Sequence, residues 1–152
     1  MVWNDYGNLV IDDREYVPAR LRAVVMSFIE NRYGYDYQNL QKINSALRLM
    51  SESAQIEERE RIRALDLTNT VVANRVKKDV RPDYSRWRVV PLGGGRFDIE
   101  VPIQVATTST DHPDPRNPLI TSHVINLTVQ TVPATDINPL GYVIVSTGRD
   151  IL

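Results

Sequence analysis

The hydrophobic pattern of the chain changes its period once, and this change constrains the fold more than any other feature. Residues 18–65 carry apolar side chains at helical spacing, whereas residues 85–147 alternate as strands do. Helices followed by a run of strands predict an α+β architecture, with the helices packed on one face of an antiparallel sheet. A chain of 152 residues can bury one such core. We therefore expect a single domain over residues 17–152, after an extended lead-in over residues 1–16.

Three helices are predicted in the first half. The first begins at Pro18, because proline fits the first helical turn, and ends at Gly34, a natural C-terminal stop. The second follows Asp36 as its N-cap, and the third covers residues 53–66 with its alternating charges in solvent. Residues 69–79 are compatible with a continuing helix or with a linker. The residues expected to face the core are Leu21, Val24, Val25, Phe28 and Ile29 in the first helix, Leu40, Ile43, Leu47 and Met50 in the second, and Ile56, Ile62 and Leu65 in the third.

Four strands are predicted in the second half, over residues 85–92, 96–110, 120–132 and 141–148. The three consecutive glycines of residues 93–95 indicate a hairpin turn between the first two. Pro102 restricts the middle of its strand to an edge or a bulge, because proline has no N–H to donate. The expected fold is therefore a curved, antiparallel, four-stranded sheet packed on helices.

The composition excludes several kinds of chemistry. Without cysteine the chain has no disulfide and no thiolate ligand or nucleophile. The two histidines, His112 and His123, have no carboxylate at a ligand-like spacing, and no nucleophile-elbow motif is present. A net charge of −1 argues against a nucleic-acid adaptor, which would need a basic surface. No apolar run reaches the roughly 18 residues of a membrane span. We expect no metal and no cofactor.

The most informative short segment is Asn138-Pro139-Leu140-Gly141, which leads into the last apolar strand at Tyr142. Asparagine first, proline second and glycine fourth are the residues that a type I turn prefers. The asparagine side chain can cap such a turn, and Leu140 is expected at its exposed tip. Taken alone, the segment predicts a tight turn and nothing more.

Together with the helical first half and the strand meander, this turn resembles a known family. Asn138, Pro139 and Gly141, followed by the aromatic Tyr142, are similar to the Asn-Pro-x-Gly segment of VirB-eight-like (TrbF-like) inner-membrane components of type IV secretion and conjugation systems. The resemblance extends from about residue 18 to residue 150, and the related DotI/IcmL-type components share it. The proline-rich segment 111–118 has no counterpart in that pattern.

The resemblance implies a fold like that of nuclear transport factor two and a non-enzymatic role. Members of the family are assembly scaffolds, often homodimers or higher homo-oligomers, at the periplasmic face of the bacterial inner membrane. They contact other secretion subunits and carry a membrane helix upstream of this domain, which the present sequence does not contain. In this interpretation Asn138 to Tyr142 form an interaction motif, with no catalytic, cofactor or metal residues and no direct contact with nucleic acid.

A second hypothesis remains open, because the same cone-shaped fold often encloses a pocket in isomerases, dehydratases and small-ligand binders. Fold alone does not choose between these classes. An enzyme of this kind would need an inward acid or histidine in an apolar pocket. The candidates in this sequence are Tyr33, Tyr35, Asp36 and His123.

Overall fold

The computed structural model describes residues 2–3, 9–10 and 18–148 of the chain. Strands β1 (Val2–Trp3) and β2 (Leu9–Val10) pair antiparallel. The rest of the predicted lead-in, residues 1–16, lies outside the described residues.

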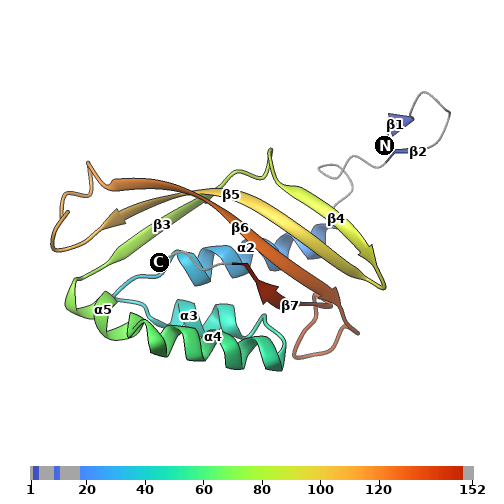
Figure 1. Ribbon diagram of the computed structural model, residues 1–152, viewed down its shortest axis with the longest axis horizontal. Helices are drawn as coiled ribbons and strands as arrows, with labels where there is room; N and C mark the ends of the chain where they lie inside the picture. The colour runs from blue at the N-terminus through green and yellow to red at the C-terminus, as the bar shows by residue number, and fades with distance from the viewer. Residues whose placement is uncertain (1, 4–8, 11–17, 149–152) are drawn as a thin grey trace.

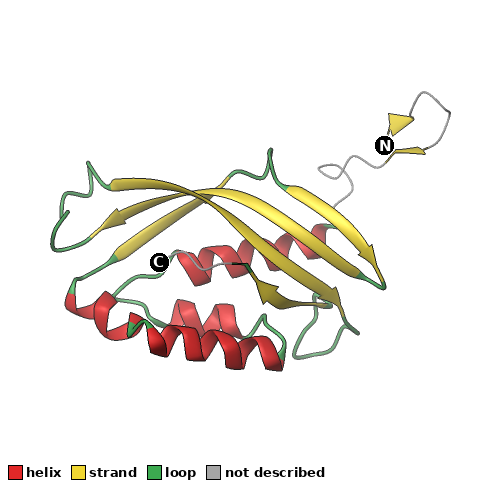
Figure 2. Cartoon of the chain, in the orientation of Figure 1, coloured by secondary structure: helices red, strands yellow, loops and turns green. Residues whose placement is uncertain are grey.

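The remaining elements form two layers, a helical layer and a sheet that arches over it (Figure 1). The helices are α2 (Ala19–Tyr33), α3 (Gln41–Leu47), α4 (Glu52–Ala64) and α5 (Leu67–Ala73). The sheet contains β3 (Lys77–Pro82), β4 (Arg88–Gly93), β5 (Arg96–Thr108), β6 (Leu119–Thr131) and β7 (Tyr142–Thr147). Its order is β3-β5-β6-β7, with β4 also beside β5, and every pairing is antiparallel. Figure 2 shows these helices on one face of the sheet, so the predicted α+β class is confirmed.

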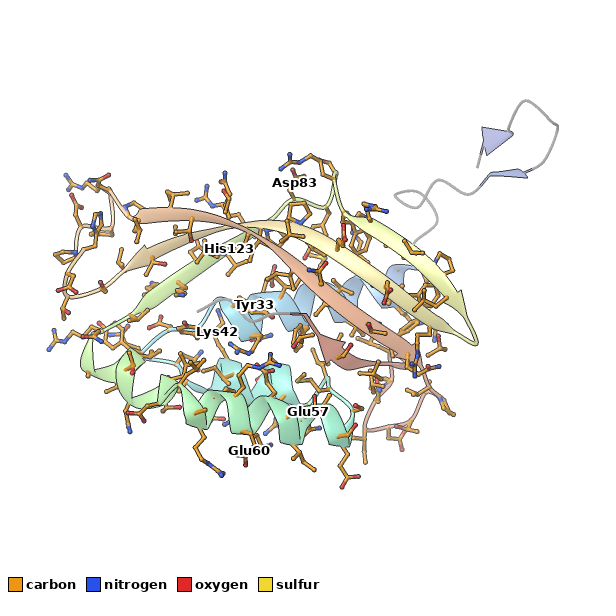
Figure 3. All side chains as sticks on the ribbon, in the orientation of Figure 1. Tyr33, Lys42, Glu57, Glu60, Asp83 and His123 are labelled. Carbon is orange, nitrogen blue, oxygen red and sulfur yellow. The ribbon has the colours of Figure 1, made fainter. Side chains whose placement is uncertain are left out.

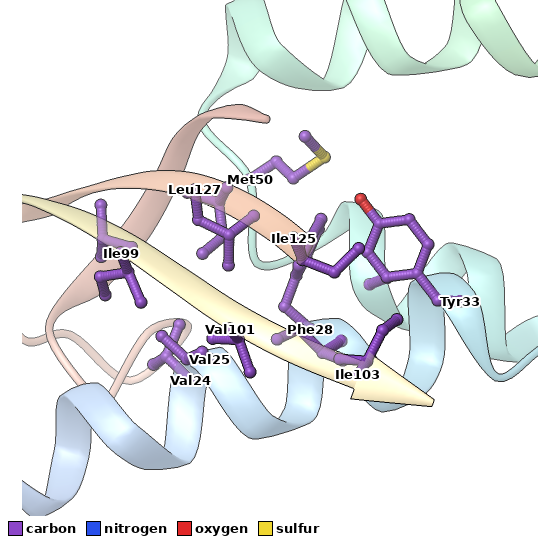
Figure 4. Close-up of a cluster of buried hydrophobic side chains, with 14 of the residues drawn as sticks. Val24, Val25, Phe28, Tyr33, Met50, Ile99, Val101, Ile103, Ile125 and Leu127 are labelled. Carbon is purple, nitrogen blue, oxygen red and sulfur yellow. The ribbon is translucent and has the colours of Figure 1, made fainter. Parts of the chain in front are cut away.

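The core lies between α2 and the long strands β5 and β6 (Figure 4). The apolar face predicted for the first helix is fully buried, since its five members are all 0% exposed. Phe28 packs edge-to-face on Tyr33, with 6.2 Å between the ring centroids. The sheet contributes alternate residues to the same cluster: Ile99, Val101, Ile103 and Val105 from β5, and Ile125, Leu127 and Val129 from β6.

Two of the helix predictions need correction. Asp36 is not an N-cap, because α3 begins at Gln41 after Leu40, which makes no side-chain capping bond. The Asp36 carboxylate instead accepts the Gln38 N–H at 2.9 Å and holds a turn ahead of the helix. The apolar face predicted for this segment is nevertheless confirmed, as Ile43, Leu47 and Met50 are buried and Leu40 is partly so.

The inner face of α4 also differs from the prediction. Ile56 and Leu65 are 59% and 40% exposed, and only Ile62 of the predicted set packs against the core. The buried residues of this helix are Ala54 and Glu58. Ile56 lies two positions from each of them, which is half a turn or more around the helix, so it must point outward.

The sheet contains one strand more than predicted, because residues 77–82 form β3 beside the C-terminal half of β5. The helix–linker ambiguity at residues 69–79 thus resolves into α5 followed by the start of this strand. Pro102 of β5 lies where its neighbour changes from β4 to β3, since Glu100 pairs with Arg88 and Ile103 with Pro82. The side of Pro102 that lacks an N–H therefore faces the gap between β4 and β3, where no strand residue pairs with it. The prediction of a local edge is confirmed. The predicted glycine hairpin joins β4 to β5.

Candidate functional site

The predicted interaction motif, Asn138 to Tyr142, covers the end of the β6–β7 turn, which we define as residues 132–141, and the first residue of β7. The Asn138 side chain accepts the Gly141 N–H at 3.2 Å and donates to the Tyr142 carbonyl at 3.1 Å. Thr135 closes the other side, because its N–H donates to the Asn138 carbonyl and its hydroxyl accepts the Asn138 N–H, both at 3.0 Å. The predicted capping role of the asparagine is present, and these bonds fix the backbone of the turn.

Gly141 is required for the exit of the turn. Its φ is +75°, a left-handed conformation that L-residues rarely adopt, and the residue is buried. A Cβ atom built on Gly141 would lie 3.2 Å from the carbonyl oxygen of Val132, whose N–H donates to the Gly141 carbonyl at 2.9 Å. Both the backbone angle and the close approach therefore select glycine.

Gly141→Ala is expected to cost about 1–3 kcal/mol of unfolding free energy, the range for an L-residue held in this backbone region. Gly94→Ala is the matched control, because Gly94 also has positive φ (+63°) but a Cβ there meets nothing within 4 Å. Urea denaturation of the two variants separates backbone strain from contact. If the two variants lost the same unfolding free energy, the contact between the new Cβ and the Val132 carbonyl would have no measurable effect on stability.

The turn exposes a different residue from the one predicted. Leu140 and Tyr142 are partly buried and pack against the core, so Leu140 is not the exposed tip. Ile137 is 97% exposed and Pro139 is also exposed. The sequence contains a signal for this that was missed, namely an isolated isoleucine inside a polar loop bounded by prolines.

The strand that follows the turn is attached to the helical layer. Ile144 of β7 donates its N–H to the Leu49 carbonyl at 2.8 Å, and its carbonyl accepts the Ser51 N–H at 2.9 Å. At the end of β7, the Thr147 hydroxyl accepts from the Arg61 guanidinium at 3.1 Å. The β6–β7 turn is therefore presented from a strand held on both sides.

Arg61 belongs to a buried ionic network that no local sequence pattern indicates. Glu58 accepts from Arg61 at 3.2 Å and from the Arg32 Nε at 2.5 Å. Arg32 and Glu58 are 1% and 2% exposed, so the pair joins α2 to α4 inside the protein. The network thus links α2, α4 and β7 through charge-assisted hydrogen bonds.

The four residues proposed for the enzyme hypothesis do not form one site. Tyr33 and Tyr35 are buried in the core cluster, and the Asp36 carboxylate is engaged in its turn. His123 lies on the sheet, in a different layer from Tyr33 (Figure 3), with its Nε2 2.9 Å from the Thr121 hydroxyl. The open groove of about 770 Å³ that His123 lines is completed by Arg81, Pro82, Asp83, Arg86, Pro102, Ile103, Gln104, Ser122 and Val124.

Two titratable groups near this groove, Asp83 and Tyr84, are poorly placed for acid–base catalysis. Hydrogen bonds from Ser85 and Arg86 hold the pKa of Asp83 below its ordinary value. Burial raises the pKa of the neighbouring Tyr84 above its ordinary value. Both shifts move away from neutral pH, where a general acid or base works best. Within the described residues, no three His, Asp or Glu side chains come together as metal ligands.

No family model matches the chain, and no curated protein is significantly similar to it in sequence. Solved structures with the same fold do exist. An IcmL-like type IV secretion system protein from Legionella pneumophila has a TM-score of 0.69 at 16% identity, covering 87% of this chain and 91% of its own. The soluble domain of TrwG from the type IV secretion machinery of Bartonella grahamii has a TM-score of 0.66 at 18% identity, covering 91% and 99%. VirB8 from Agrobacterium tumefaciens has a TM-score of 0.61 at 14% identity, covering 95% and 99%.

Proposed function

We propose that the chain is the periplasmic domain of a VirB8-like component of a type IV secretion or conjugation system and acts as a non-enzymatic assembly scaffold. The observation that carries this proposal is the fold likeness, which covers nearly the whole of both chains and joins this protein to components of one kind of machine. The Asn-Pro-Leu-Gly turn adds independent support, since it follows from the residues alone.

The proposal places the domain at the periplasmic face of the inner membrane, in contact with other secretion subunits. No helix in the described part of the chain is long and apolar enough to cross a bilayer.

Within this role the β6–β7 turn is the proposed contact surface. Ile137 is a nearly fully exposed aliphatic side chain, and such side chains gain most when a partner covers them. Its backbone is held by the Asn138 and Thr135 bonds, so little conformational entropy is lost when a partner binds. A rigid turn with an apolar tip fits a shallow apolar pocket on another subunit.

Ile137→Asp is expected to leave the fold unchanged and to weaken assembly. Because the side chain touches little of its own chain, the unfolding free energy should change by no more than about 0.5 kcal/mol. Plasmid or substrate transfer, measured by complementation in a strain that lacks its own copy, should fall at least about tenfold, as for a buried interface anchor.

Val72→Asp is the matched control, because Val72 is an exposed aliphatic residue of α5, 49% exposed, on another surface. It should transfer as well as the unmodified protein. Full transfer by Ile137→Asp would reject the turn as a contact surface and leave the scaffold role to other surfaces. If both variants lost transfer, the effect of Ile137→Asp would reflect an added surface charge in general and would not support the turn as a contact surface.

A further inference from the structure

In the part of the chain that the structure describes, strand β6 has a free edge along half of its length. On one side β5 pairs with β6 from Leu119 to Gln130. On the other side β7 pairs only with Leu127 to Thr131, and Gly148 adds one bond to the Asn126 carbonyl at 2.8 Å. Figure 1 shows β6 extending well past the short β7. Residues 119–125 therefore have a neighbouring strand on one side only, within the described chain.

The register shows which backbone groups lie on this edge. The Pro102 carbonyl accepts from Asp83 on the β3 side, so Pro102 and its partner Val124 turn their backbone groups away from each other. Strands alternate, so Ser122 and Ile120 direct their N–H and C=O groups the same way as Val124. This agrees with Asn126, two residues further on, which bonds to Gly148. No described residue bonds to the backbone of Ile120, Ser122 or Val124.

The other edges of the sheet are protected and this one is not. Edge strands avoid pairing with other chains through charges, prolines, bulges or covering segments. The β3 edge carries Lys77, Lys78, Asp79 and Arg81, and the β4 edge carries Arg88, Pro91 and a bulge. Leu49 and Ser51 cover β7. Residues 119–125 contain no Asp, Glu, Lys or Arg, and Leu119, Ile120 and Val124 are 51%, 54% and 53% exposed.

We propose that a second copy of this chain pairs with this edge, antiparallel and through the same residues, with the two-fold axis at Ser122. In this register Ile120 faces Val124 of the second copy, and Ser122 faces Ser122. Each of the three residues then exchanges an N–H and a C=O with the other copy, as hydrogen-bonded antiparallel pairs do. The cross-strand pairs are β-branched aliphatic and hydroxyl pairs, which stabilise sheets.

Paired with its own copy about Ser122, the segment places the exposed Ile120 opposite the exposed Val124 and brings no acidic or basic side chains together. A two-fold interface requires this kind of self-complementarity, so a second copy is the partner that we propose. The sheet would run continuously through both molecules. The family resemblance already implies self-association, and the new part of the inference is the edge and the register through which two copies pair. It depends on the β6 edge and not on a secretion role or on the β6–β7 turn.

Ser122→Pro tests the backbone part of the interface. Its N–H points to the free edge, so proline removes a bond between copies and none to β5. We expect unchanged circular dichroism and an association constant lowered at least about tenfold, measured by sedimentation equilibrium from micromolar to millimolar concentrations. Leu92→Asp, on the exposed edge strand β4, is the control and should associate as the unmodified chain does. Gln104→Pro is unsuitable as a control, because Gln104 belongs to the central strand β5.

A charge exchange tests the register. Ile120→Lys alone and Val124→Glu alone should each weaken association, because an unpaired charge faces an aliphatic side chain of the other copy. The double variant should associate more tightly than either, since position 120 faces position 124 across the axis and opposite charges meet. This rescue does not depend on whether Ser122→Pro folds.

The absence of cysteine permits a third measurement. Hydrogen-bonded residues across an antiparallel pair have Cα atoms about 5.5 Å apart, within disulfide range. Ser122→Cys should form a covalent dimer on mild oxidation, whereas Gln104→Cys on β5 should not.

A monomer at every concentration would leave the edge to another occupant, such as the segment after Gly148, and overturn the proposal. Association that survives Ser122→Pro, or no rescue by the double variant, would also overturn it.

Discussion

Replacing Glu58 with alanine is expected to lower the free energy of unfolding by about 3–5 kcal/mol, the cost of breaking a buried ion pair from one side. Arg32 is 1% exposed, and its guanidinium would lose this carboxylate in a place that water does not reach. The same change removes one of the two acceptors of Arg61, and the other, Thr147, joins α4 to β7. Urea denaturation followed by circular dichroism measures the loss.

Glu60→Ala is the matched control on the same helix. Glu60 also pairs with an arginine, Arg63, but both side chains are well exposed, at 64% and 76%. Such surface pairs contribute between zero and about 1 kcal/mol, so the control should be almost as stable as the unmodified chain. A double change of Arg32→Met and Glu58→Leu should recover much of the loss, since it removes both charges of the pair together. Similar losses for Glu58→Ala and Glu60→Ala would show that the buried pair has no special role.

Phe28→Ala is expected to destabilise the protein by a similar amount, about 3–5 kcal/mol, as large-to-small changes of core aromatics do. Phe28 is 0% exposed between α2 and the sheet, and its ring also contacts Tyr33. The change leaves a cavity that the two layers can close only by moving α2, which carries six other buried residues. The thermal or urea midpoint measures the effect.

Phe97→Ala serves as the control for Phe28→Ala. Phe97 is the other phenylalanine of the chain, and it is only partly buried at the start of β5. Phe97→Ala should therefore lower the unfolding free energy clearly less than Phe28→Ala does. A loss below about 1 kcal/mol for Phe28→Ala would contradict the assignment of Phe28 to the core.

The sequence predicted those elements whose residues are selected by local rules. The face of α2 follows from spacing alone, because its five apolar residues fit one helical stripe. The turn at Asn138 and Gly141 follows from the preferences of those two residues for a capped turn and a left-handed exit. The hairpin at residues 93–95 was predicted for the same reason.

The rest depends on partners that lie far away in the sequence. Glu58 is buried because Arg32, 26 residues earlier, neutralises it, and no local pattern shows that. Strand β3 was missed because its residues are mostly polar and charged, as an edge strand permits. Leu140 was placed at the tip of its turn because its packing against the core was not visible. Ile137 took that position instead.

The attachment of Ile144 to Leu49 and Ser51 has a consequence for the order of folding. These bonds join the last strand to the junction of α3 and α4, most of the chain away. Closing so long a loop costs entropy before any contact compensates for it, so this step should come late. A chain emerging from a ribosome or a translocation channel cannot complete its core until the C-terminal strand has emerged. Until then the edge of β6 that pairs with β7 and the α3–α4 junction remain accessible to chaperones and proteases.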